Sequence, residues 1–340
     1  MGLLTYISKR IALSALVILG TITITFFLSR VVPSNPAALW VGQHPRPEQI
    51  ARAREILGLD KPLYVQYFSY LSDVLHGDLG LSIRFKGRSV LSDILSFLPA
   101  TLELVITAFV IALALGIPLG VISAIKENKI TDHLTRTISI AGASIPVFWL
   151  GIVFQIVFFG MLGILPLTGR LSTEIQLTNP ITRITGFYLI DSLVTGNWLA
   201  FKDALAHLIL PAITIAAYPL GLCTRMVRAT MIEVLRENYI RAARASGIPE
   251  RTIVFRYALK NAIVPAFTAI SLSFAYSITG AFLVEFIFSW GGIGSYLTYA
   301  LQTIDYPVII GVTIFVCIFY VTINLLLDIF QVVVDPRVKY

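Results

Sequence analysis

Charged side chains are scarce in this chain. Of its 340 residues only 13% are Asp, Glu, Lys or Arg, whereas 56% are hydrophobic. Soluble globular domains carry about 25% charged residues. So apolar a composition excludes a soluble domain and indicates a protein that crosses the membrane several times. The net charge is +7, and the basic residues lie mostly between the apolar runs, as expected of a membrane protein with several spans. No nucleic-acid partner is needed to explain this charge.

Cysteine and histidine are also rare. Cys223 and Cys317 lie in apolar runs, so we expect two small core residues and no disulfide. The four histidines are scattered along the chain without the spacing of metal ligands. The sequence therefore predicts neither a metal site nor another cofactor.

Catalytic motifs are missing as well. No Gly is followed by Lys, so the chain lacks the phosphate-binding loop of an ATPase. No histidine lies in the core of an apolar run and no pair of aspartates appears, so a membrane-embedded enzyme has no candidate nucleophile and base. We expect a protein that is not an enzyme and has no catalytic residue.

The sequence has six long apolar runs instead. A helix needs about 20 apolar residues to cross roughly 30 Å of hydrocarbon. We expect an all-α membrane protein with a single domain, 1–340, and helices in its external loop. The first run is too long for a signal peptide and lacks a cleavage site, so it is predicted to be a retained span. The predicted spans are about 11–32, 100–125, 137–165, 206–227, 264–288 and 307–330.

The positions of Lys and Arg predict the orientation. With six spans both chain ends lie on one side, and that side also carries the strongly basic loop 228–263. The loop 166–204, on the opposite side, holds only Arg170, Arg183 and Lys202. Because cytoplasmic loops are enriched in Lys and Arg, we expect both termini in the cytoplasm and the long loop 33–99 outside.

The external loop 33–99 is predicted to contain two helices. One extends from Pro47 to about 57 and is stopped by Gly58. The other covers 62–76, with an apolar face that we expect to pack on the membrane surface or over the external mouth of a passage. The loop 166–204 carries no motif that indicates a function.

The longest polar segment between two apolar runs is 225–265. No proline interrupts 226–248, and apolar or small residues recur there at a helical spacing. Gly247 suits the left-handed conformation at a helix end, and Pro249 suits the first turn of another helix. We expect a helix over 231–247, a sharp turn and a second helix. The small or apolar face is predicted at Met231, Leu235, Asn238/Tyr239, Ala242 and Ser246, and the charged face at Glu233, Arg236, Glu237, Ile240/Arg241 and Arg244.

Within this segment Arg241-Ala242-Ala243 is followed, three residues later, by Gly247. The pattern resembles the EAA loop of ABC-transporter permeases, in which Glu-Ala-Ala and three further residues precede Gly. Arg241 stands where Glu is usual, a form that is similar to the oligopeptide/dipeptide branch of that family. In the family this loop is the coupling helix, which docks into a groove on a separate ATPase subunit. The alternative is a basic cytoplasmic loop that only fixes the orientation.

The resemblance covers nearly the whole length and is weakest in 166–204. It includes the segments 77–82, 98–104, 144–149, 284–294, 305–307 and 335–337. It implies a permease subunit of an ABC importer in the cell membrane, for di- or oligopeptides, of the first-permease type with a long first external loop. Other solutes, including sugars and nickel, are carried by relatives, and one permease sequence does not separate these substrates.

The same resemblance implies partners and coupling residues. The partners are a second homologous permease, two ATP-binding subunits that hydrolyse the ATP, an extracytoplasmic substrate-binding protein and the lipid bilayer. This chain would form half of the translocation pathway. The implied ATPase-coupling residues are Glu237, Arg241, Ala242, Ala243, Arg244 and Gly247.

Two residues of the spans are candidates for the pathway. Pro146 marks a place where the third span can flex. Glu285 lies deep in an apolar run, where an ionisable side chain usually faces the bundle interior or water, although it could equally cap a backbone group. For Glu103 we favour an interfacial carboxylate over a role in the pathway.

A secondary transporter for a small solute is the alternative function. Such proteins place ionisable residues near the middle of the membrane for ion coupling. The acidic residues within or near the predicted spans are Glu103, Glu285 and Asp328, and all are closer to a span end than to the midplane. The pattern therefore favours an ATP-driven importer.

The predicted orientation can be tested by labelling. We expect a cysteine at Asn179 to react with an impermeant maleimide added to intact cells, because the loop 166–204 is predicted to be external. A cysteine at Ser246, in the basic loop, should react only after the cells are opened. Labelling of Ser246→Cys in intact cells would reverse the assignment.

Overall fold

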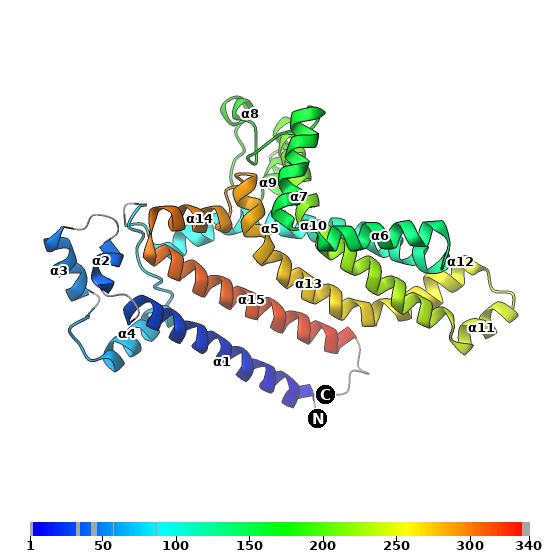
Figure 1. Cartoon of the computed structure of the whole chain (residues 1–340), viewed down its shortest axis with the longest axis horizontal. Coiled ribbons are helices and arrows are strands. Elements are labelled where there is room, and N and C mark those ends of the chain that lie inside the picture. The colour runs from blue at the N-terminus through cyan, green and yellow to red at the C-terminus, as the bar shows by residue number, and fades with distance from the viewer. Residues whose placement is uncertain (1–2, 32–34, 42–45, 57, 86, 335–340) are drawn as a thin grey trace. The chain divides into compact units, whose positions relative to one another are not determined.

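The computed structural model describes residues 3–31, 35–41, 46–56, 58–85 and 87–334, and within these residues it is helical without a named strand (Figure 1). The all-α fold expected from the sequence is confirmed. The described residues form two compact units, 1–99 with 291–326 and 100–290 with 327–334. Helices α5 (Val90–Ile125) and α15 (Tyr306–Val334) contribute residues to both units.

The first unit contains α1 (Leu3–Arg30), α2 (Pro36–Val41), α3 (Pro47–Ile56), α4 (Leu63–Leu75) and α14 (Ile293–Thr303). The two helices predicted in the external loop are confirmed as α3 and α4, and each is followed by a glycine with positive φ, Gly58 and Gly77. Pro62 precedes α4 with extended backbone, since its fixed φ suits a helix start.

The core of the first unit lies where α4 crosses α1 and α15. Tyr70 and Val74 of α4 pack against Phe26 of α1 and against Ile310 and Ile314 of α15. Side-chain hydroxyls add to this contact, since Thr25 and Tyr70 lie 3.2 Å apart. The apolar face of α4, which we expected on the membrane surface or over the external mouth of a passage, packs on α1 and α15 within the first unit.

Two segments that are far apart in the sequence meet around the buried carboxylate of Asp305. It accepts a hydrogen bond of 2.6 Å from Ser82 Oγ and one of 3.0 Å from the Arg84 backbone N–H. The chain turns before α14 at Gly291, with φ +74°, whereas Gly294 is buried inside α14.

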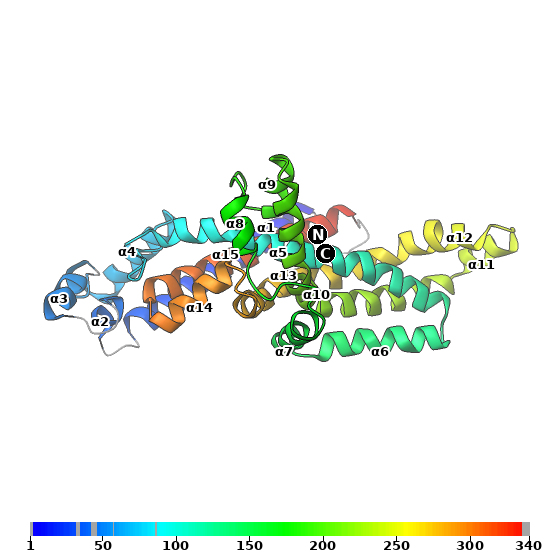
Figure 2. The ribbon, with the colours of Figure 1, turned by 90° about the horizontal axis from the view of Figure 1, so that it is seen from above.

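The second unit is built around α10 (Trp198–Leu235), which packs along α13 (Leu259–Ile287) and α6 (Ile130–Ser144) (Figure 2). The other elements are α7 (Val147–Phe154), the π-helical turn η1 (Gln155–Met161), α8 (Thr173–Thr178), α9 (Tyr188–Val194), α11 (Asn238–Ala245), α12 (Glu250–Thr252) and the π-helical turn η2 (Ile253–Ala258).

Four helices among the described residues are long and apolar enough to cross a membrane, within α1, α5, α10 and α15. The run predicted as one span over 137–165 is broken, because α6 and the helix 147–161 meet at 105°. Pro146 causes the break: it has no N–H to give, and it holds the preceding Ile145 in extended backbone. Counted as one span, this pair is a fifth. The remaining predicted span, 264–288, corresponds to α13, and the number of six remains a prediction.

Helices α5 and α10 approach closely where two glycines of α5 face α10. A Cβ atom built on Gly120 would lie 2.8 Å from the Cβ of Val227 and 2.9 Å from the carbonyl oxygen of Thr224. One turn earlier, a Cβ on Gly116 would lie 3.0 Å from Cys223. Small residues four positions apart allow helix backbones to pack closely in membranes.

This packing generates a prediction for Gly120→Ala. The added methyl group should push α5 from α10 and lower the free energy of unfolding by about 1–3 kcal/mol, as overpacking does. Thermal denaturation of the purified chain in detergent measures this. The matched control is Gly160→Ala, because the nearest atom to a Cβ there is 4.0 Å away. Equal melting temperatures for the two variants would disprove the close contact.

Candidate functional site

The polar segment 225–265 comprises the end of α10, the short helices α11 and α12, the π-helical turn η2 and the start of α13. Helix α10 ends at Leu235, and α11 starts again at Asn238 after Glu237, whose backbone is extended. The single helix predicted over 231–247 is therefore wrong. Gly247 has φ +73° and Pro249 precedes α12, so the predicted turn after the helix is confirmed.

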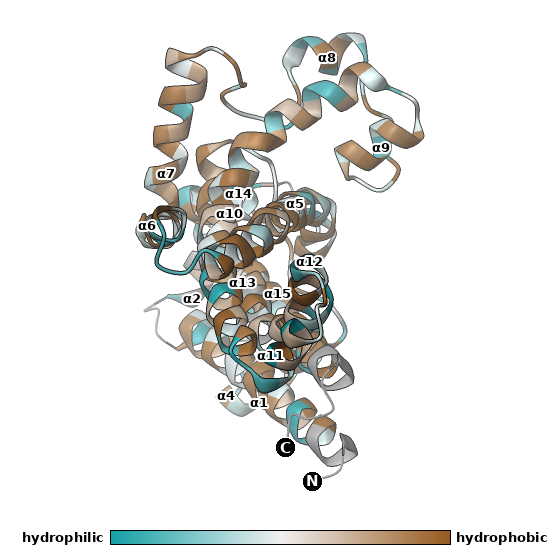
Figure 3. Ribbon diagram, turned by 90° about the vertical axis from the view of Figure 1, so that its right-hand side faces the viewer, coloured by the Kyte–Doolittle hydropathy of each residue, from teal (hydrophilic) through white to brown (hydrophobic). Residues whose placement is uncertain are grey.

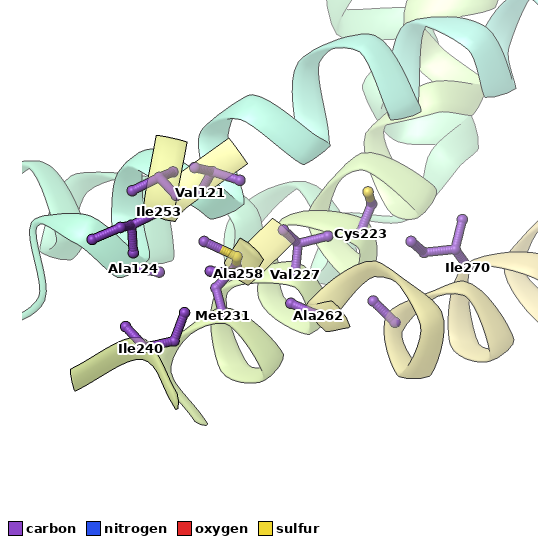
Figure 4. Packing of buried hydrophobic residues seen from close by; sticks show 12 residues of the cluster. Val121, Ala124, Cys223, Val227, Met231, Ile240, Ile253, Ala258, Ala262 and Ile270 are labelled. Atoms are coloured by element: carbon purple, nitrogen blue, oxygen red, sulfur yellow. The ribbon is translucent and has the colours of Figure 1, made fainter. Parts of the chain in front are cut away.

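The break before α11 is explained by the side chain of Ile240. It is fully buried and belongs to a cluster with Met231 of α10, Ile253 of η2 and Val121 of α5 (Figure 4). An unbroken helix would have carried this side chain to the charged face, where the sequence pattern placed it. Removing an isoleucine side chain from water contributes about 1.5–3 kcal/mol, which favours the broken arrangement.

The opposite side of α11 is exposed. The pieces α11 and α12 are conspicuously hydrophilic when the ribbon is coloured by hydropathy (Figure 3). Of the two adjacent alanines, Ala242 is exposed, whereas Ala243 is partly buried against the cluster around Ile240. Tyr239, 43% exposed, accepts a hydrogen bond of 2.9 Å from the side chain of Asn261. We call the exposed residues of α11 and its C-cap the outer face: Asn238, Tyr239, Arg241, Ala242, Arg244, Ala245 and Ser246.

Ion pairs hold both ends of α11 in place. Arg244 and Glu250 are joined across the Gly247 turn, with 2.7 Å between Nε and Oε1. Before α11, Arg236 reaches Glu127 at 2.9 Å and so ties the end of α10 to the segment after α5. Both pairs are solvent-exposed, so each contributes at most about 1 kcal/mol. Of the coupling residues expected from the sequence, only Ala243 is partly buried, and Arg244 and Gly247 shape the turn after α11. The exposed ones are Glu237, Arg241, Ala242, Arg244 and Gly247.

A buried ion pair lies deeper in the same bundle and was not foreseen from the sequence. Asp132 of α6 accepts two hydrogen bonds from the guanidinium of Arg228 on α10, at 2.6 and 2.7 Å. The Asp132 carboxylate is completely buried and also accepts bonds from Ser123 and from the backbone N–H of Asn128. Such bidentate pairing fixes α6 and α10 in one register. The pair could not be predicted because its two residues are 96 positions apart in the sequence.

The two candidate pathway residues occupy different surroundings. Pro146 lines a cavity of about 280 Å³ together with Tyr218 of α10 and Ser277 of α13. Glu285 is fully buried and accepts a hydrogen bond of 2.6 Å from Thr101 Oγ1, away from that cavity. The structure therefore does not bring Pro146 and Glu285 together.

Glu103 anchors the loop 166–204. Its carboxylate lies 2.6 Å from Arg170 and accepts a bond of 2.8 Å from the backbone N–H of Leu189. In the same loop Asp191 accepts bonds from the backbone of Thr185 and Gly186. Burial alone would raise the pKa of Asp191, but these hydrogen bonds hold it below its ordinary value. The loop 166–204, in which the sequence showed no motif, is therefore ordered by side-chain contacts and contains the helices α8 and α9.

The buried pair gives a testable consequence. We expect Arg228→Met to lower the free energy of unfolding by about 3–5 kcal/mol, because Asp132 is left charged and buried. The double variant Asp132→Asn with Arg228→Met should recover most of the loss, since a neutral amide costs less to bury than a carboxylate and its oxygen can still accept one of the two bonds from Ser123 and Asn128. Denaturation of both variants in detergent measures the difference. Equal losses would show that the ionic contact has no energetic role.

Comparisons with known proteins agree with this architecture. The family model described as "Binding-protein-dependent transport system inner membrane component" matches residues 116–340, and the model of its N-terminal component matches residues 3–105. A probable D,D-dipeptide transport system permease protein of Escherichia coli is 45% identical over 323 residues, which cover 95% of this chain and 94% of that protein.

Two further relatives align over nearly their whole length. A di/tripeptide transport system permease protein of Pseudomonas aeruginosa is 39% identical, with 99% of each chain covered. A dipeptide transport system permease protein of Escherichia coli is 38% identical, again with 99% of each covered. The resemblance to ABC-importer permeases is thus confirmed, and a secondary transporter is not favoured. The chain belongs to the family of inner membrane components of binding-protein-dependent transport systems.

Proposed function

We propose that this permease carries di- or oligopeptides into the cell. The support is the similarity over whole chains to permeases whose names state dipeptide or di/tripeptide transport. The chain itself would perform no chemistry, since the sequence has no phosphate-binding loop. ATP would be hydrolysed by two separate subunits, and a binding protein outside the membrane would deliver the peptide.

The outer face of α11 is the proposed contact with an ATPase subunit. The observation that supports this most directly is that the two sides of α11 differ in burial. Ile240 is buried in the bundle, whereas Arg241 and Ala242 are exposed. A small side chain such as Ala242 lets a partner surface approach the helix backbone closely. The proposal places both termini and the loop 228–263 in the cytoplasm, where ATP is available.

Movement at α11 would be passed to the spans through rigid contacts. Ile240 packs on residues of α5, α10 and η2, and the pair Asp132–Arg228 joins α10 to α6. A shift of α11 imposed by the ATPases therefore cannot occur without a shift of these helices, because packed cores do not deform continuously. Alternating access of the peptide from the two sides would follow.

The cavity at the α6–α7 bend is the proposed part of the pathway on this chain. It lies between α10, α13 and the bend at Pro146, and Tyr218 and Ser277 give it hydrogen-bonding groups. Proline breaks are places where spanning helices can change their angle. A second, homologous permease would supply the other half of the passage.

Coupling is tested with Ala242→Asp. Because Ala242 is exposed, the substitution should change the free energy of unfolding by no more than about 0.5 kcal/mol. Docking would bury an unpartnered carboxylate, so the ATPase subunits should no longer co-purify and substrate-stimulated ATP turnover should fall at least ten-fold.

Two matched variants make the result specific. Ala51→Asp places the same charge on the exposed surface of α3 and should leave co-purification intact. Ala243→Asp should in addition lower the melting temperature of the isolated chain, because Ala243 contacts the chain's own core. Normal ATPase association and turnover with Ala242→Asp would remove α11 as the coupling element.

A further inference from the structure

The first unit contains a cavity that is lined by both polar and apolar residues. It has a volume of about 180 Å³ and lies between the end of α1, α2, α4 and the start of α15. A single water occupies about 30 Å³ of liquid, so the space would hold several waters or a small organic molecule. It is open to solvent beside Asp73, which is exposed.

Two buried polar atoms at this cavity have no hydrogen-bond partner in the described part of the chain. One is a donor, Nε1 of Trp40, and the other is an acceptor, Oε1 of Gln66. Gln66 is only 9% exposed, and its amide nitrogen is already committed to the carbonyl oxygens of Leu59 and Lys61. Leaving such an atom unsatisfied costs about 1–3 kcal/mol, so both atoms call for a partner that the described residues do not supply.

The charges around the cavity are of both signs. The Arg30 guanidinium lies over the Trp40 ring, 5.3 Å from its centroid, so a cation and an N–H donor occupy the same wall. Asp73 and the Gln66 carbonyl supply acceptors on α4. An anionic group fits the first wall, and an ammonium group fits the second.

We propose that this cavity binds a small zwitterion, with its anionic group toward Arg30 and Trp40 and its ammonium group toward Gln66 and Asp73. Two sources share this chemistry. One is the phosphoethanolamine headgroup of a lipid, since Arg30 ends one predicted span and Ile310 lies near the start of another. The other is a free amino acid or dipeptide. The site does not depend on which solute the transporter carries.

Binding is tested on the purified full chain in nanodiscs of phosphatidylglycerol. Phosphoethanolamine, glycylglycine and inorganic phosphate are titrated separately by calorimetry. At least one zwitterion should bind, and more tightly than phosphate. Trp40→Phe, which removes the N–H but keeps an aromatic ring, and Asp73→Asn should each weaken that binding at least five-fold. Trp198→Phe is the matched control, because Trp198 is 61% exposed in the second unit.

Mass spectrometry of the chain purified from native membranes separates the two sources. Phosphatidylethanolamine that is retained by the wild type and lost from Trp40→Phe would assign the site to lipid. Binding of glycylglycine without retained lipid would assign it to a free zwitterion. The proposal is overturned if no zwitterion binds, if phosphate binds as well as the zwitterions, or if Trp198→Phe weakens binding as much as Trp40→Phe.

Discussion

Burial of Ile240 is the contact on which the exposed, basic end of this protein depends. Without it α11 would be a hydrophilic helix of eight residues, too short to be stable in water by itself. With it, α11 has a fixed position against α5, α10 and η2, and its opposite face is free for another protein. Burial of this one apolar side chain thus explains the break at Arg236 and Glu237 and determines which residues of α11 are exposed.

Much of the fold follows from the sequence, because hydrophobic run length and proline or glycine punctuation are local signals. The apolar runs, the helices α3 and α4, and the turn at Gly247 are of this kind. The sequence does not show which side of α11 faces the core. A two-residue break resets the helical periodicity and moves Ile240 from the predicted charged face into the core. Which of two adjacent alanines faces outward could therefore not be predicted.

Long-range polar contacts were beyond prediction for a different reason. Asp132 and Arg228, or Ser82 and Asp305, carry no local pattern that points to each other, and only the tertiary fold brings the members of each pair within hydrogen-bonding distance. The same holds for Glu103. The sequence favoured an interfacial carboxylate there, but it did not indicate the contacts with Arg170 and with the backbone of Leu189. Buried charges are therefore placed by the fold and not by a local sequence signal.

The length of α10 has a mechanical consequence. At about 1.5 Å per residue its 38 residues extend roughly 57 Å, well beyond the hydrocarbon thickness of about 30 Å. A helix of this length that crossed the bilayer would extend beyond the hydrocarbon, and the C-terminal end of α10 leads into α11. A tilt of about 10° over that length displaces one end by roughly 10 Å relative to the other. Pro211 and Pro219 lie near the middle of the helix, where each removes a backbone hydrogen bond, so α10 bends most easily there.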